Sequence, residues 1–186
     1  RSTRKESSAV SDVYKRKVNI FLNENFSITI IKMKKMKVVF LHGLESFGKQ
    51  KKEYLQTQFD EVFAPIIDYR KETVWNELYQ QIEAFQPDYL IGSSMGGYFA
   101  YLYAQHFNIP ILVFNPALQG RSVNPIVDES GEYQPNCTVI LGKNDEVINP
   151  NLTRKKLVEY SSIDIYEENI EHQIPQDIFI KYVDNI

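Results

Sequence analysis

The chain contains the stretch Ile91-Gly92-Ser93-Ser94-Met95-Gly96-Gly97, in which a G-x-S-x-G pentapeptide is followed by one more glycine. The residues before it, 88–91, have the apolar character of a buried strand, and the aromatic run 98–104 after it is typical of a helix. A strand-to-helix turn of this kind projects its central serine above the edge of a sheet. Ser94 is therefore a candidate nucleophile. A plain small-residue turn, with Ser94 as the helix cap, is the alternative interpretation.

The residue types around Ser94 fit such a turn. Gly92 and Gly96 lie two positions before and after the serine, where we expect strand and helix backbones to crowd each other and leave no room for a Cβ. Met95 is the first residue of the expected helix. Its amide can therefore face the oxyanion that develops on a carbonyl group attacked by the serine.

Composition indicates a soluble globular protein, because 186 residues with 43% hydrophobic and 24% charged content match ordinary folded domains. Cys137 is the single cysteine, which excludes an intramolecular disulfide and argues against a cysteine-based zinc site. The three histidines show no H-E-x-x-H spacing. We therefore expect no metal and no cofactor, and a reducing, cytoplasmic location is compatible with this cysteine content.

Charge divides the chain into two unequal parts. Residues 1–37 carry ten Lys/Arg against three Asp/Glu, a net charge of +7, whereas residues 38–186 carry a net charge of −10. No basic groove with interleaved aromatic residues accompanies this block, so we expect a solvated tail and no nucleic-acid partner. The β-prone runs 18–22 and 26–31 are too short to span a membrane and can form a hairpin. We expect a basic extension, a leader or a tag, over residues 1–35 and one catalytic domain over 36–186.

From Met36 onward, short apolar runs alternate with helical patterns, which predicts a three-layer α/β/α sandwich around a mostly parallel sheet. The expected strands are 37–42, 62–67, 89–92, 111–115, 138–142 and 164–167. The expected helices are 49–59, 73–85, 95–107, 151–160 and 176–183. The stretch between residues 115 and 136 is too short for a substantial cap domain.

In a sheet of this kind, ligands bind beyond the carboxyl ends of the strands. Asp145 follows the strand that ends at Gly142, and His172 follows the last strand, so both residue types occur where chemistry is expected. Glu146, beside Asp145, and Asp68, after the second expected strand, are alternative acids. Of the other two histidines, His42 belongs to the turn after the first strand, and His106 lies about three turns along the helix that follows Ser94, too far for proton transfer.

Residues 36–186 resemble a small, nearly lidless α/β-hydrolase and are similar to the YqiA-type esterase family. The matching motifs are Phe40-Leu41-His42-Gly43-Leu44-Glu45-Ser46, Gly92-Ser93-Ser94-Met95-Gly96-Gly97, Gly142-Lys143-Asn144-Asp145-Glu146-Val147 and Glu171-His172. They occur in the chain order nucleophile, acid, base that α/β-hydrolases use. The resemblance implies serine-ester hydrolase chemistry.

The expected function is hydrolysis of small carboxylic esters or thioesters through an acyl-enzyme on Ser94, with a Ser94-His172-Asp145 triad. The amides of Leu44 and Met95 are the expected oxyanion donors. A small-molecule acyl ester is thus the expected partner, and the alternative is a non-catalytic binding protein on the same fold. The sequence leaves the acyl chain length and the oligomeric state open.

Overall fold

The computed structural model describes residues 19–22, 28–31, 34–157 and 162–186. Six strands form one sheet in the order β4-β3-β5-β6-β7-β8, and every neighbouring pair is parallel. The strands are β3 (Lys34–Leu41), β4 (Phe59–Phe63), β5 (Tyr89–Ser93), β6 (Ile111–Phe114), β7 (Cys137–Gly142) and β8 (Ile163–Glu168). The predicted parallel sheet is confirmed.

Alternate residues of the central strands face opposite sides of the sheet, because the side-chain period of a strand is two. Val39 and Leu41 of β3 join one hydrophobic core, whereas Val38 and Phe40 join the other. β6 alternates in the same way: Ile111 and Val113 join the first core, and Leu112 and Phe114 join the second. Such nearly continuous apolar runs are typical of strands buried on both faces.

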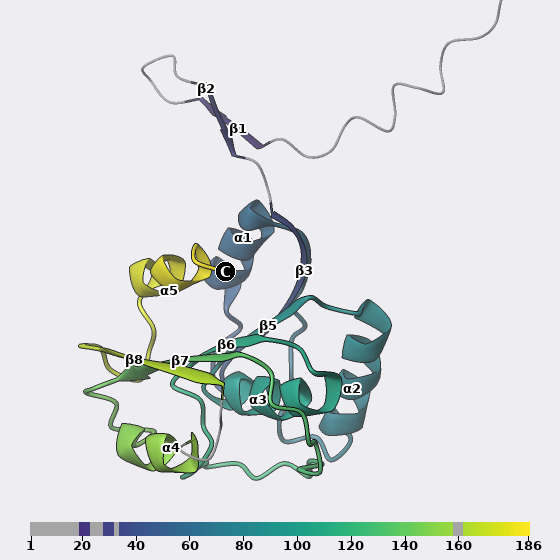
Figure 1. The fold of residues 1–186 in the computed structure, drawn as a ribbon, viewed down its shortest axis with the longest axis vertical. Helices are drawn as coiled ribbons and strands as arrows, with labels where there is room; N and C mark the ends of the chain where they lie inside the picture. Colours follow the sequence, from purple (N-terminus) through teal and green to yellow (C-terminus); the bar gives the residue numbers. More distant parts are fainter. Residues whose placement is uncertain (1–18, 23–27, 32–33, 158–161) are drawn as a thin grey trace, which may run out of the picture.

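Helices cover both faces of the sheet, which gives the predicted three layers (Figure 1). On one face lie α1 (Lys49–Gln58) and α5 (Gln176–Val183), and on the other lie α2 (Val74–Phe85), α3 (Met95–Phe107) and α4 (Pro150–Leu157). The central helix, α3, is buried over most of its length. This burial explains its aromatic and apolar composition and lets it hold Ser94 against the middle of the sheet.

One expected strand is misplaced in the sequence analysis. The prediction was 62–67, but β4 spans Phe59–Phe63 and follows α1 directly. Pro65 has no N–H to donate to a sheet ladder, and Ile66 is 78% exposed, so the apolar run after Phe63 leaves the sheet. The segment instead crosses the carboxyl end of β3, where it contacts His42.

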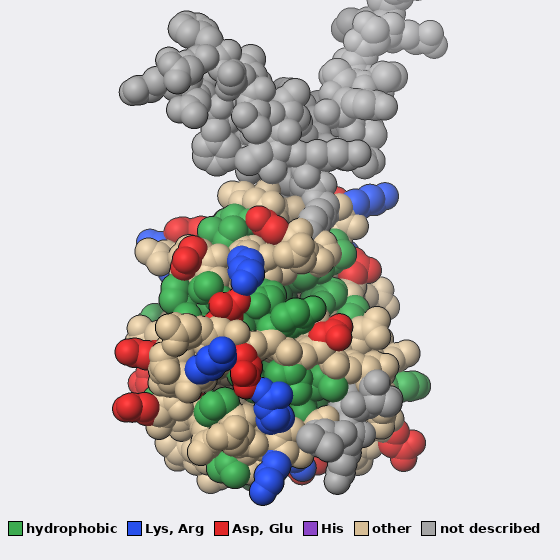
Figure 2. Space-filling model, turned by 60° about the vertical axis from the view of Figure 1, so that its left-hand side comes forward, with side chains coloured by type: hydrophobic (Ala, Val, Ile, Leu, Met, Phe, Trp, Pro, Cys, Tyr) green, Lys and Arg blue, Asp and Glu red, His purple; other side chains and the backbone are tan. Residues whose placement is uncertain are grey.

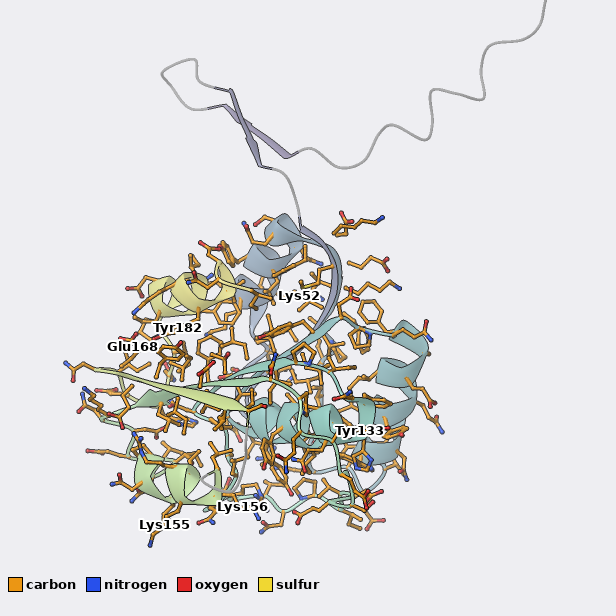
Figure 3. All side chains as sticks on the ribbon, in the orientation of Figure 1. Lys52, Tyr133, Lys155, Lys156, Glu168 and Tyr182 are labelled. Carbon is orange, nitrogen blue, oxygen red and sulfur yellow. The ribbon has the colours of Figure 1, made fainter. Side chains whose placement is uncertain are left out.

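At the other edge of the sheet, β8 and α5 are joined by polar contacts. Tyr182 donates a hydrogen bond to Glu168 Oε1 at 2.7 Å, and Lys181 lies 2.6 Å from the same oxygen (Figure 3). On the face drawn in Figure 2, acidic and basic side chains are interspersed among hydrophobic ones. The contacts of Tyr182 and Lys181 with Glu168 therefore add to the apolar contacts that hold α5 against the sheet.

Near the amino terminus, β1 (Asn19–Leu22) and β2 (Ile28–Ile31) pair antiparallel in a sheet of their own and do not extend the six-stranded sheet. Between β6 and β7, residues 115–136 carry no helix or strand, in agreement with the predicted absence of a substantial cap. None of the helices in the described ranges is long and apolar enough to cross a membrane.

Candidate active site

The turn between β5 and α3 holds Ser94 in an unusual backbone conformation. Its φ is 53° and its ψ is −117°, a region that costs about 1–3 kcal/mol for a residue with a side chain. Hydrogen bonds on both sides hold it there: its N–H donates to the Phe114 carbonyl, and its own carbonyl accepts the N–H groups of Tyr98 and Ala117. The sheet, the helix and the loop after β6 therefore all fix the position of this serine.

The crowding expected at the two flanking glycines is confirmed. A Cβ on Gly92 would lie 2.5 Å from the carbonyl oxygen of Gly96, and a Cβ on Gly96 would lie 2.0 Å from that of Leu41. Real Cβ atoms do not approach backbone atoms this closely. These glycines let α3 pack directly on the ends of β3 and β5, which brings the start of the helix to the edge of the sheet.

Ser94, His172 and Asp145 lie in one chain of hydrogen bonds. The Ser94 hydroxyl lies 2.9 Å from His172 Nε2, and His172 Nδ1 lies 2.8 Å from Asp145 Oδ2. Because a carboxylate only accepts, Nδ1 carries the proton and Nε2 is free to accept from the hydroxyl. In this tautomer the imidazole can take the proton of Ser94.

The second oxygen of Asp145 is also fixed. Oδ1 accepts the N–H groups of Val147 at 2.9 Å and Ile148 at 2.8 Å, and the side chain is only 1% exposed. The alternative acids lie elsewhere, since Glu146 and Asp68 are both exposed. The structure therefore brings Asp145, and neither alternative, to the histidine.

Two residues that the sequence analysis missed hold the loop around His172. Asn115, which is 2% exposed, donates through Nδ2 to the carbonyls of Glu171 and His172 and accepts the N–H of Gly142 through Oδ1. Lys51 Nζ donates to the Ile174 carbonyl at 3.1 Å. An asparagine that ends a strand and precedes a proline is only a weak sequence signal of a functional site. The partners of Asn115 become visible only in the folded structure.

His42 orders the loop that carries Leu44. It is 3% exposed, its Nδ1 lies 2.6 Å from the Gly43 carbonyl, and its Nε2 accepts the Ile67 N–H at 2.9 Å. These partners fix the neutral tautomer with the proton on Nδ1. The Tyr69 hydroxyl donates to the His42 carbonyl at 2.7 Å. His106, in contrast, lies near the end of α3 beside the Asp128 carbonyl.

We expect His42 to make stability depend on pH. Burial lowers its pKa from 6.5, so below pH 6.5 the unfolded chain binds a proton that the folded chain does not. The free energy of unfolding should therefore fall with decreasing pH, by up to about 1.4 kcal/mol per pH unit. Denaturant titrations between pH 7.5 and 5 should show this slope in the wild type and in His106→Gln, and a smaller slope in His42→Gln. Equal slopes in all three proteins would contradict the prediction.

A cavity of about 580 Å³ opens beside Ser94, between the loops that follow β3, β6, β7 and β8. Ser94, His172, Leu44 and Met95 all line it. Met95 is the first residue of α3, so its N–H is one of the donors that the helix itself leaves unpaired. The cavity thus lies where the sequence analysis expected the oxyanion donors.

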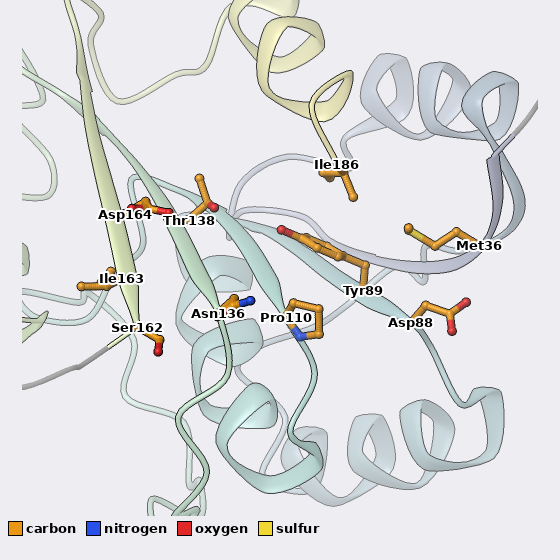
Figure 4. A pocket seen from close by; sticks show the side chains of 10 residues that line it. All are labelled: Met36, Asp88, Tyr89, Pro110, Asn136, Thr138, Ser162, Ile163, Asp164 and Ile186. Carbon is orange, nitrogen blue, oxygen red and sulfur yellow. The ribbon is translucent and has the colours of Figure 1, made fainter.

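A second cavity, of about 690 Å³, lies at the opposite end of the strands, bordered by Tyr89, Thr138, Asp164 and Ile186 (Figure 4). Its lining contains neither histidine nor cysteine. It is also at the amino ends of the strands, away from the edge where ligands of parallel sheets bind. Within the described ranges, no three His, Cys, Asp or Glu side chains are grouped to hold a metal ion.

Solved structures with the same fold include several hydrolases. A protein from Xanthomonas campestris pv. campestris, described as a hydrolase of the α/β superfamily, aligns with a TM-score of 0.63 and 15% identity, over 83% of this chain and all of that one. A monoacylglycerol lipase from Paleococcus ferrophilus aligns with a TM-score of 0.57 and 15% identity, over 79% and 92% of the two chains. The Bacillus cereus carboxylesterase aligns with a TM-score of 0.54 and 16% identity, over 83% and 88%.

Sequence comparison gives a family. No curated protein matches the sequence. The sequence profile of an uncharacterised protein family, UPF0227, matches residues 37–135, more than half of the chain. This range includes the turn around Ser94 and the loop that carries Leu44. The chain has the α/β-hydrolase fold and belongs to UPF0227, the YqiA-like family that its motifs resemble.

Proposed function

We propose that this protein is a serine hydrolase that cleaves small carboxylic esters or thioesters. The observation that carries the proposal is the hydrogen-bonded chain Ser94-His172-Asp145 on the wall of a cavity at the carboxyl ends of the strands. Further support comes from the class of similar structures, which includes a carboxylesterase and a monoacylglycerol lipase.

In the proposed mechanism, Ser94 Oγ attacks the acyl carbon while His172 Nε2 accepts the hydroxyl proton. Asp145 keeps the imidazole in the required tautomer and stabilises the imidazolium. The amides of Met95 and Leu44 stabilise the negative oxygen of the tetrahedral intermediate. Collapse releases the alcohol or thiol, which takes the proton from His172. Water, deprotonated by the same histidine, then hydrolyses the acyl-enzyme and regenerates Ser94.

The open site favours small or surface-presented acyl groups, since residues 115–136 carry no cap helix. Leu118 is buried in the core, and Val123 and Val127 pack against it, so these side chains hold the loop in place. Ile126 is 71% exposed. The acyl group is therefore expected to contact the cavity beside Ser94 and not an overlying lid.

Fluorophosphonate labelling tests the proposal without knowledge of the natural substrate. We expect one covalent adduct per chain, located on Ser94 by mass spectrometry, and none after heat denaturation. Hydrolysis of a 4-nitrophenyl ester series should be lost in proportion to labelling. A folded protein that neither reacts nor hydrolyses any ester would instead favour the non-catalytic binding protein.

We also propose that residues 36–186, together with the first two residues of β3, Lys34 and Lys35, form the catalytic domain and that the residues before them are an extension to it. The pair β1–β2 forms a sheet separate from the one that carries the site. A chain that begins at Met33 keeps all of β3, so we expect its kcat/KM for 4-nitrophenyl butyrate to lie within about twofold of the full chain. A large loss of activity in a folded, shortened protein would assign the extension a role in the site.

A further inference from the structure

Two cationic side chains line the cavity beside Ser94. Arg121 comes from the loop after β6, and Lys51 comes from α1 on the other side of the sheet. Within the described residues, neither forms an ion pair. Glu45 is the one carboxylate among the described lining residues, and it pairs with Arg70 at 2.8 Å, both side chains being well exposed. Among the residues that the structure describes, the positive charges on this cavity wall therefore have no ion-pair partner.

The contacts of Arg121 fix the plane of its guanidinium. Nη1 donates to the Ala117 carbonyl at 3.1 Å and to the Leu118 carbonyl at 2.6 Å. The guanidinium carbon lies 3.9 Å from the centre of the Tyr98 ring, and the Tyr98 hydroxyl is held by Glu129 at 2.8 Å. The side chain is thus oriented in advance of any ligand.

The remaining donors of Arg121 have no partner among the described residues. Nε is buried without a hydrogen bond, and Nη2 donates to no group in the described parts of the chain. Nε and Nη2 form one edge of the guanidinium, which binds the two oxygens of a carboxylate or phosphate through parallel hydrogen bonds. A buried donor without a partner is costly in a folded protein, and an anion at this edge would remove that cost.

Resting on the proposed ester hydrolysis, we propose that the substrate carries an anionic group, a carboxylate or a phosphate, which binds the Nε–Nη2 edge of Arg121. Lys51, which lines the same cavity, adds positive potential. Because Nε is buried, contact with it requires the atoms that now cover it to move. Arg121 is then the residue that selects charged esters over neutral ones, and it takes no part in proton transfer.

Matched ester pairs test this proposal. Mono-4-nitrophenyl adipate and 4-nitrophenyl hexanoate have the same chain length and differ in the charge of the acyl group. The pair 4-carboxyphenyl hexanoate and its methyl ester differ in the charge of the leaving group. We expect the wild type to prefer the charged member of one pair in kcat/KM by about 10- to 100-fold, and the responsive pair shows on which side of the ester bond the anion lies.

Arg121→Met should abolish that preference, so that the charged and neutral members of the responsive pair have equal kcat/KM values, while Arg121→Lys should retain part of the preference. Lys52→Met and Lys155→Met are matched controls. Both remove one positive charge outside the cavity lining (Figure 3), so both should keep the full preference. An Arg121 that only holds the loop would lower both members of a pair equally. That result, or a wild type that prefers neither charged ester, would overturn the proposal.

A binding measurement separates this proposal from the proposed function. In Ser94→Ala, calorimetry should show that the charged ester binds at least tenfold more tightly than its neutral partner, and that Arg121→Met in the same background removes the difference. If the wild type hydrolyses no ester but this difference persists, anion binding stands and the esterase fails. If hydrolysis occurs without any such difference, the anion site fails and the esterase stands.

Discussion

Replacement of Ser94 by alanine is expected to lower kcat for 4-nitrophenyl esters by about 10⁴- to 10⁶-fold, because the hydroxyl that we propose attacks the acyl carbon is lost. Stopped assays at high enzyme concentration measure the residual rate against the buffer reaction. The fold should remain, since the alanine Cβ occupies the place of the serine Cβ and the backbone hydrogen bonds of residue 94 are unchanged. Unaltered thermal unfolding should accompany the loss.

A double variant sharpens this prediction. The Ser94 hydroxyl and His172 act as one hydrogen-bonded unit, so Ser94→Ala, His172→Ala and the double variant should lose activity to a similar extent. Ser130→Ala, an exposed serine on the loop after β6, should retain full activity. Losses that multiply in the double variant would mean that the two side chains act independently and would contradict the proposed mechanism.

Replacement of Gly96 by alanine is expected to destabilise the protein by at least about 4 kcal/mol, at the upper end of single-substitution effects. The new Cβ would lie 2.0 Å from the Leu41 carbonyl oxygen and 2.5 Å from that of His42. Leu41 is the last residue of β3 and His42 follows it, so these are backbone atoms at the end of a strand, and relief requires α3 to move away from the sheet. Thermal unfolding followed by circular dichroism should show a Tm about 8–16 °C lower, or no cooperative transition.

Gly43→Ala is the matched control for this steric argument. Its Cβ would meet its nearest atom, the Ser94 Cβ, at 3.4 Å, which is an ordinary van der Waals contact. We expect its Tm to lie within a few degrees of the wild type. If Gly43→Ala and Gly96→Ala unfold at the same temperature, close packing of α3 against β3 does not control stability.

Local sequence patterns predicted most of the fold. The bounds expected for α3 and α5 match the structure, because each is a largely apolar run with a turn signal at its ends. β4 lies earlier in the sequence than the predicted strand 62–67, and the sequence itself contains the cause, because Pro65 stands two residues after the end of β4. Apolar character alone placed the strand too late, because Ile67 is buried against His42 in a loop.

The candidate site was predictable only where motifs mark it. The turn at Ser94 and the positions of Asp145 and His172 follow from residue type and from their place after strands. Asn115 and Lys51 carry no such mark, because their partners are backbone carbonyls from other segments. Arg121 carries none either, because the ring on which it stacks is more than twenty positions away. Contacts of this kind depend on how loops meet in space, which single-sequence patterns do not encode.

The order of the hydrogen-bonded chain along the polypeptide has a consequence for biosynthesis. The imidazole that faces Ser94 comes from 78 positions further on, and Asn115 clamps the loop around it only after β7 has joined the sheet. Contacts between residues so far apart in the sequence form late in folding, because the entropy cost of closing the loop between them opposes the contact until the intervening strands are in place. A growing chain on the ribosome therefore exposes the serine turn long before its base is synthesised. Under the proposed mechanism, activity should appear only after the segment that carries His172 has been synthesised, and recovered turnover after dilution from denaturant should report the last step of refolding.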